Sequence, residues 1–133
     1  MNVLVDTSVW SAFLREQRDP TDPIVKRLET LIRADVVEII GPIRQELLSG
    51  VAPQSRFLDL KDYLRSYKDV FLDEEDYENA AQYHNVCRGR GIKATGVDAL
   101  ICAAAVRHGL RIFSLDKDFL FYSQHLPIKL MKI

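Results

Sequence analysis

Residues 1–10 of the chain, MNVLVDTSVW, place a short apolar run directly in front of a carboxylate. The run at 3–5 has the apolar, β-branched character of a buried strand, and Asp6 ends it. Burying a carboxylate is costly unless the group is paired, hydrogen-bonded or bound to a metal. Two interpretations of Asp6 therefore stay open: a cap for the helix that follows, or part of a polar site at the end of the strand.

Short apolar runs alternate with longer, helix-periodic segments along the rest of the chain. Strands are expected at residues 3–5, 36–40, 70–72 and 111–115, with an edge strand over 126–133. Helices are expected at residues 9–14, 24–32, 42–48, 53–67, 73–88 and 97–109. This alternation predicts βαβ units around a parallel sheet, within one α/β domain spanning residues 1–133.

The composition limits the class of protein. The 133 residues are 47% hydrophobic and 28% charged, so we expect one ordinary domain. The formal net charge of −1 neither indicates nor excludes a polyanionic partner. Cys87 and Cys102 are too few and too scattered for a disulfide scaffold or a zinc site. The N-terminus lacks a signal-peptide pattern and no segment resembles a membrane span, so we expect a cytoplasmic protein.

Four carboxylates are expected at one edge of the sheet. Asp6 and Asp116 end strands, Asp98 opens the helix before the last of those strands, and Glu46 lies early in the helix after the second strand. Each has an ordinary structural explanation as a cap or an exposed helix residue, and Asp118 is a secondary candidate. Ligands gather beyond the carboxyl ends of parallel strands, so the four together favour a functional site.

Crowded carboxylates repel one another unless a divalent cation offsets the repulsion. Oxygen ligands favour Mg²⁺, with Mn²⁺ as a substitute, and no His or Cys has the spacing of a zinc site. Such ions activate water and stabilise charge during the cleavage of a phosphodiester. The pattern therefore predicts a metal-dependent nuclease.

Four motifs carry a family resemblance, which covers nearly the whole chain. They are DTS at 6–8, QELLSG at 45–50, VDALICAAA at 97–105 and SLDKDF at 114–119. In this order the chain resembles PIN-domain ribonucleases, and its size and motifs resemble the VapC-type toxins of toxin–antitoxin pairs. Ser114 stands where the family more often has threonine. The resemblance implies a PIN-like three-layer α/β/α fold with a mostly parallel central sheet.

The resemblance also implies an activity and roles for individual residues. It implies a Mg²⁺-dependent endoribonuclease that acts on RNA, is inhibited by a protein antitoxin and forms a homodimer. Asp6, Asp98 and Asp116 would bind the metal, and Glu46 would complete the cluster or orient the attacking water. Three hydroxyls beside these carboxylates are expected to hydrogen-bond to them: those of Thr7, Ser8 and Ser114.

A basic, glycine-containing loop leads to Asp98 and is a candidate RNA-binding surface. Arg88, Arg90 and Lys93 would contact phosphates beside an acidic site that otherwise repels RNA. The alternative is a solvated turn, since the glycines alone account for the loop.

Two other classes of function use related features. An acidic-pocket phosphatase of the haloacid-dehalogenase type requires a second Asp two residues after the first, and this chain has Ser8 at that position. A receiver-type phosphoacceptor requires an acidic pair before the first helix, and this sequence lacks such a pair. No glycine-rich phosphate loop is present in the sequence. The other alternative is a non-catalytic PIN-like module that binds RNA or protein, and the intact acidic set argues against it.

Overall fold

Four parallel strands form the centre of the computed structural model, which describes residues 1–132. Their order across the sheet is β3-β2-β1-β4, so the N-terminal strand lies inside the sheet and pairs with a strand from each half of the chain. The strands are β1 (Val3–Val5), β2 (Val37–Ile39), β3 (Lys68–Asp69) and β4 (Arg111–Phe113).

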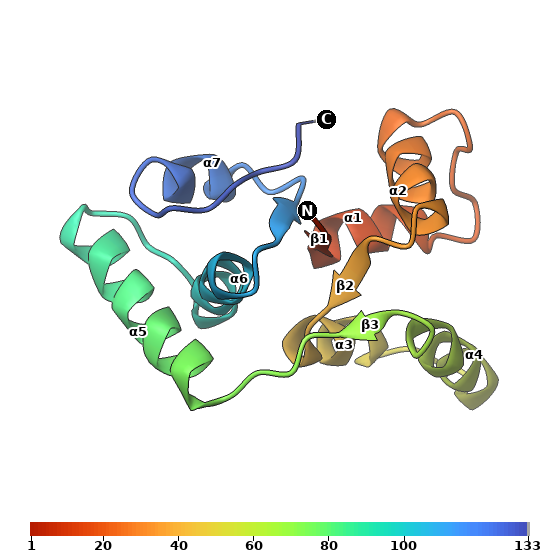
Figure 1. The fold of residues 1–133 in the computed structure, drawn as a ribbon. Helices are drawn as coiled ribbons and strands as arrows, with labels where there is room; N and C mark the ends of the chain where they lie inside the picture. The colour runs from red at the N-terminus through yellow and green to blue at the C-terminus, as the bar shows by residue number, and fades with distance from the viewer. Residues whose placement is uncertain (133) are drawn as a thin grey trace.

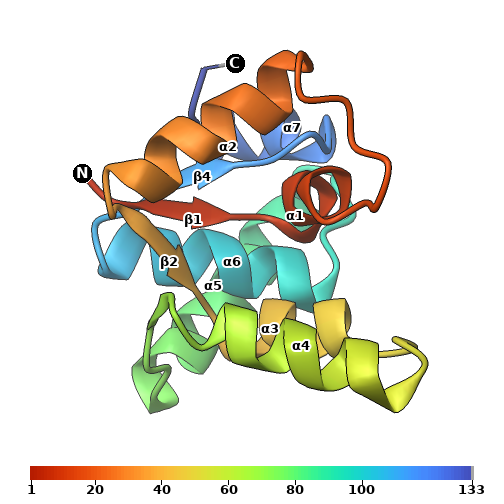
Figure 2. The ribbon, with the colours of Figure 1, turned by 90° about the vertical axis from the view of Figure 1, so that its right-hand side faces the viewer.

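Helices cover both faces of this sheet. Figure 1 views the layers from the side, with α1 and α2 on one side of the strands and α5 and α6 on the other. Figure 2 shows β1, β2 and β4 running between these two sets of helices. The three-layer α/β/α architecture with a parallel sheet is therefore confirmed. The helices are α1 (Thr7–Phe13), α2 (Pro23–Arg33), α3 (Gly41–Leu48), α4 (Gln54–Leu64), α5 (Glu74–Gly89), α6 (Gly96–Arg107) and α7 (Asp118–Ser123).

The core lies on both faces of β1, whose three residues are all buried. Trp10 on α1 is fully buried and stacks edge-on with Phe13, as expected of core residues. Cys87 and Cys102 are both buried, and neither forms a disulfide within residues 1–132. No helix within residues 1–132 has the length and apolar character that crossing a bilayer requires.

The expected strand at 70–72 is wrong in its position. The strand that pairs with β2 is β3, at 68–69, and Val70 only continues it through a hydrogen bond from its N–H to the Ile39 carbonyl, at 2.8 Å. Phe71 has 86% of its surface exposed. The apolar run therefore lacks a second buried face, and the chain leaves the sheet after Val70.

The expected edge strand at 126–133 is reduced to a single parallel bridge between Leu130 and Ile112 of β4. The Ile112 N–H donates to the Lys129 carbonyl at 2.8 Å, and the Met131 N–H donates to the Ile112 carbonyl at 2.8 Å. Residue 133 lies outside the described part of the chain. The segment still covers the outer side of β4, which matters for the groove described below.

An ion-pair network around the buried Asp76 joins the start of α5 to the end of α6. Asp76 is fully buried, and its side chain accepts a hydrogen bond from the Asp73 N–H at 2.9 Å in a capping box. Arg107 of α6 donates to Asp76 at 2.9 Å and also binds Asp73. His108 Nε2 lies 3.0 Å from the other oxygen of Asp76. The network fixes α5 against α6 and so positions the N-terminus of α6.

Asp76→Ala is expected to destabilise the fold by about 2–3 kcal/mol, because it removes half of the capping box and the buried acceptor of Arg107, which keeps Asp73 and Glu75 as partners. Urea unfolding followed by circular dichroism measures the change. Glu74→Ala is the matched control, since Glu74 is an exposed acid in the same helical turn. Equal unfolding midpoints for the two variants would contradict the role of Asp76.

Candidate metal centre

The pairing of β1 with β4 brings two polar segments together. Val5 is in register with Phe113, and the Asp6 N–H donates to the Phe113 carbonyl at 2.9 Å. Both strands run in the same direction, so Asp6 and Ser114 leave the sheet side by side at its carboxyl edge. Residues that lie more than a hundred positions apart in sequence are thereby placed in contact.

The Asp6 carboxylate accepts hydrogen bonds from both expected serines. Ser8 Oγ donates to Asp6 Oδ2 at 2.8 Å, and Ser114 Oγ donates to the same oxygen at 2.7 Å. Asp6 is 8% exposed and occupies the N-cap position of α1, but its side chain makes no capping hydrogen bond. Thr7 does not contribute, because its buried Oγ1 has no hydrogen-bond partner within residues 1–132. The cap interpretation of the Asp6 side chain is therefore wrong, and its second oxygen is left available.

Ser114 also orders the turn after β4. The Asp116 N–H donates to Ser114 Oγ at 3.0 Å, and the Asp118 N–H donates to Asp116 Oδ1 at 2.9 Å. The Leu115 N–H donates to Ser8 Oγ at 3.0 Å, which ties the same turn to the start of α1. Two exposed carboxylates, those of Asp116 and Asp118, are held on this turn at the start of α7.

The N-terminus of α6 presents Asp98 to the same edge. Thr95 caps this helix by accepting a hydrogen bond from the Asp98 N–H at 3.0 Å, and Tyr122 on α7 donates to Asp98 Oδ2 at 2.8 Å. Burial raises the pKa of Asp98, the bond from Tyr122 opposes that rise, and the charges of Asp116 and Asp6 add to it. The raised pKa reflects a carboxylate held in a partly dry site next to other negative charges.

Three of these carboxylates are close enough to share one cation. Asp98, Asp116 and Asp118 each offer one oxygen, and the three oxygens lie within 4.8 Å of one another. Asp6 is outside this group of three, but its charge still acts on Asp98. The donors are all carboxylate oxygens, which fits a hard divalent cation such as Mg²⁺ or Mn²⁺.

Glu46 is not brought into this cluster. It lies in the second turn of α3, a helix that starts directly after β2, and its side chain is exposed. Among residues 1–132 it forms no hydrogen bond or ion pair, and it does not belong to the group of three acids. Its proposed part in catalysis stays a prediction.

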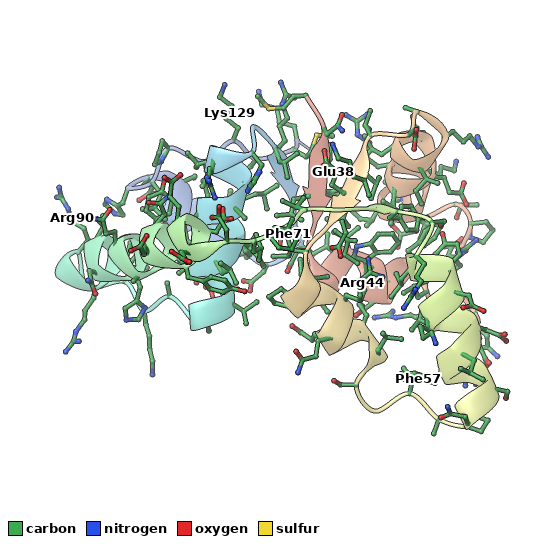
Figure 3. The ribbon with its side chains drawn as sticks, turned by 60° about the horizontal axis from the view of Figure 1, so that its bottom comes forward. Glu38, Arg44, Phe57, Phe71, Arg90 and Lys129 are labelled. Atoms are coloured by element: carbon green, nitrogen blue, oxygen red, sulfur yellow. The ribbon has the colours of Figure 1, made fainter. Side chains whose placement is uncertain are left out.

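The basic residues before α6 are exposed. Arg88 is in the last turn of α5, Arg90 caps that helix, and Figure 3 shows Arg90 at its outer end. Arg88 and Lys93 line a hollow of about 380 Å³ whose wall includes His84, and the His84 ring contacts the Ala94 carbonyl at 3.1 Å. The turn is therefore ordered, and its cations face solvent.

The sequence alone did not predict the hydrogen bond from Tyr122 to Asp98 or the place of Asp118 among the three clustered acids. Tyr122 was not singled out, although the spacing of Phe119 and Tyr122 in DKDFLFYS predicts that both point inward from one helix face. Asp118 was only a secondary candidate, yet it lies within the group of three acids, whereas Asp6 does not.

Residues 3–123 match the family model described as the PIN domain. Two relatives are similar in sequence: the VapC ribonuclease Mb1587 of Mycobacterium bovis and the ribonuclease VapC11 of Mycobacterium tuberculosis. Each is 31% identical to this chain over 119 residues, which is 88% of this chain and 88% of the relative.

Solved structures share the fold at lower identity. FitAcB from Neisseria gonorrhoeae has a TM-score of 0.75 and 22% identity, and the match covers 98% of this chain and 96% of that one. VapBC2 from Rickettsia felis, solved with a DNA fragment from its promoter, has a TM-score of 0.77 and 13% identity, with 98% of both chains covered.

Asp98→Asn should keep or raise the melting temperature of the metal-free protein at neutral pH. The pKa of Asp98 is raised on folding, so its favourable contribution is present below the unfolded pKa and is lost as the pH rises through the folded pKa. Asn keeps an acceptor for Tyr122 and removes the charge. Each kcal/mol regained corresponds to roughly 2–8 °C.

Calorimetry in chelator at neutral and acidic pH measures this effect, and the gain should shrink as the pH falls. Asp62→Asn is the control, because Asp62 is exposed on α4 and forms no hydrogen bond or ion pair within residues 1–132. A lower melting temperature for Asp98→Asn at neutral pH would argue against repulsion within the cluster.

Proposed function

The chain belongs to the PIN domain family, and on this basis we propose that it is a Mg²⁺-dependent endoribonuclease acting as the toxin of a toxin–antitoxin pair. The observation that carries the proposal is the convergence of Asp98, Asp116 and Asp118 at the end of the sheet. Relatives of similar length are ribonucleases by name, which supports RNA as the substrate.

The proposed division of roles follows from the contacts. Asp98, Asp116 and Asp118 hold the divalent cation, which when bound activates water and offsets the charge that develops on the phosphate. Tyr122 fixes the orientation of Asp98, and Asp6 adds a further carboxylate whose second oxygen accepts no hydrogen bond within residues 1–132.

Hydroxyl groups set the geometry on which this chemistry depends. Ser8 and Ser114 both hold Asp6, and Ser114 also holds the turn that carries Asp116. We propose that Glu46, which enters from α3 at the same edge of the sheet, orients the attacking water when RNA is bound. Its exposed position leaves it free to change rotamer on binding.

Partners follow from the family rather than from the geometry. Structural neighbours include a toxin-antitoxin complex from Klebsiella pneumoniae and VapBC-5, of the VapBC family of toxin-antitoxin systems, so we propose that this chain also pairs with a protein antitoxin. A homodimer and a cytoplasmic location belong to the same proposal.

Asp98→Asn and Asp116→Asn should each lower RNA cleavage by about a hundredfold or more, because each removes one carboxylate from the cation site. Glu46→Gln should lower the cleavage rate while leaving the affinity for Mg²⁺ unchanged. Cleavage of labelled RNA is measured with Mg²⁺ and with EDTA, and Mg²⁺ affinity is measured by calorimetry.

Asp62→Asn is the control for these variants and should cleave RNA at the wild-type rate. Full activity in Asp98→Asn would contradict the metal assignment. Hydrolysis of a generic phosphomonoester in place of RNA would favour the phosphatase alternative, and RNA binding without cleavage would favour the non-catalytic module.

Replacing Arg88, Arg90 and Lys93 by Ala should weaken RNA binding and flatten its salt dependence. Each lost phosphate contact removes about 0.7 of a released counterion from the slope for a single strand. The cleavage-site preference should stay the same, because phosphate contacts carry little base information. Binding is titrated in Asp98→Asn at several salt concentrations. An unchanged slope would mean that the loop is a solvated connection.

A further inference from the structure

An apolar groove of about 570 Å³ opens next to the acidic cluster. Its walls come from β4, the turn after it, α7 and the C-terminal segment that bridges to β4. The apolar side chains that line it are Ile112, Leu115, Phe119, Leu120, Leu130 and Met131. Two of them are widely exposed: Leu115 at 40% and Leu120 at 57%.

The groove is continuous with the candidate metal centre. Ser114 and Asp116 line the groove, and the same two residues order the turn that carries the acidic cluster. A molecule bound in the groove would therefore lie directly beside a phosphate at the proposed cation site. The mechanism proposed above leaves the groove unused.

The charges at the groove favour an anionic occupant. Lys117 and Lys132 line it and are both exposed. Within residues 1–132, neither ammonium group has a carboxylate within ion-pair distance. Leucine and methionine walls with two lysines suit a molecule that has an apolar face and an attached negative charge.

We propose that this groove binds one nucleobase of single-stranded RNA, next to the phosphate that lies at the acidic cluster. The proposal rests on the ribonuclease function proposed above and adds a base-binding subsite to it. A base presents a flat apolar face to Leu115 and Leu120, while its phosphates lie near Lys117 and Lys132.

The charge argues for RNA over a peptide. A peptide with an apolar side chain would fill the walls equally well, but it would leave the two lysines without a partner unless it were acidic. An acidic peptide would also meet the lysines, but it carries no phosphodiester to place beside Asp116 at the end of the groove. A nucleotide meets the lysines through its phosphates and places the reacting phosphate at the metal site, where a bound cation neutralises the acids.

The test compares two short labelled strands: a mixed-sequence RNA, and the same sugar-phosphate length built from abasic units. Fluorescence anisotropy measures the Kd of each with Mg²⁺ in the Asp98→Asn background, so that no cleavage interferes. The groove variants are Leu120→Gln and the double variant Leu115→Gln/Leu120→Gln. Glutamine removes apolar surface without adding charge. Leu58→Gln on α4 is the matched control, since Leu58 is 43% exposed and lies outside the groove.

The parent protein should prefer the base-bearing strand, and the double variant should lose about tenfold of that preference while its Kd for the abasic strand stays the same. Leu120→Gln alone should lose part of the preference, and Leu58→Gln none. An unchanged preference in the double variant would overturn the proposal. Equal weakening for both strands would overturn it too, because the groove would then act on phosphates only.

Because the experiment measures binding and not cleavage, failure of the base-binding proposal can be distinguished from failure of the ribonuclease proposal. A wild-type protein that binds RNA but never cleaves it would contradict the ribonuclease function and leave the groove result standing. Cleavage of RNA by the wild-type protein, together with an unchanged base preference in the groove variants, would support the ribonuclease and reject the subsite.

Discussion

The hydrogen bonds that Ser8 and Ser114 donate to one oxygen of Asp6 are the contacts on which the rest of the site depends. They reach across the β1–β4 pair and allow a carboxylate to be buried at the end of the central strand. Because Ser114 also accepts from the Asp116 N–H, one hydroxyl connects the buried acid to the exposed turn. The sheet, the start of α1 and the acidic turn are thereby held as one unit.

The crowding of carboxylates at this site lowers the stability of the folded protein. Burial and two neighbouring carboxylates raise the pKa of Asp98, so the ionised form of this side chain is less stable in the folded protein than in the unfolded chain. The scaffold supplies compensation away from the site. Asp76 and Arg107 fix α5 to α6, and Thr95 caps the helix that carries Asp98, so the repulsion is confined to side chains on firmly held elements.

The sequence was informative where local pattern and chemistry coincide. The run before Asp6 and the parallel βα alternation predicted that Asp6, Asp98 and Asp116 approach one edge of the sheet, and their mutual electrostatic effect agrees with this. Glu46, predicted with them, does not join the group of acids. The sequence pattern did not predict features that depend on packing between residues far apart in the chain. The apolar run at 70–72 resembled a strand, but most of the Phe71 side chain faces solvent. Asp76 was indistinguishable from its acidic neighbours, since only the fold brings Arg107 to it.

The same reasoning explains why the proposed recognition of RNA has to be local in this chain. A net charge of −1 gives no general attraction for a polyanion, and the acidic cluster repels one until a cation is bound. Affinity then has to come from exposed cations such as Arg88 and Lys117, which carry no base information. Discrimination between sequences needs a surface that contacts bases. The groove beside Asp116 combines apolar walls with direct access to the candidate metal site, so a base held there would fix which phosphate reaches the proposed cation.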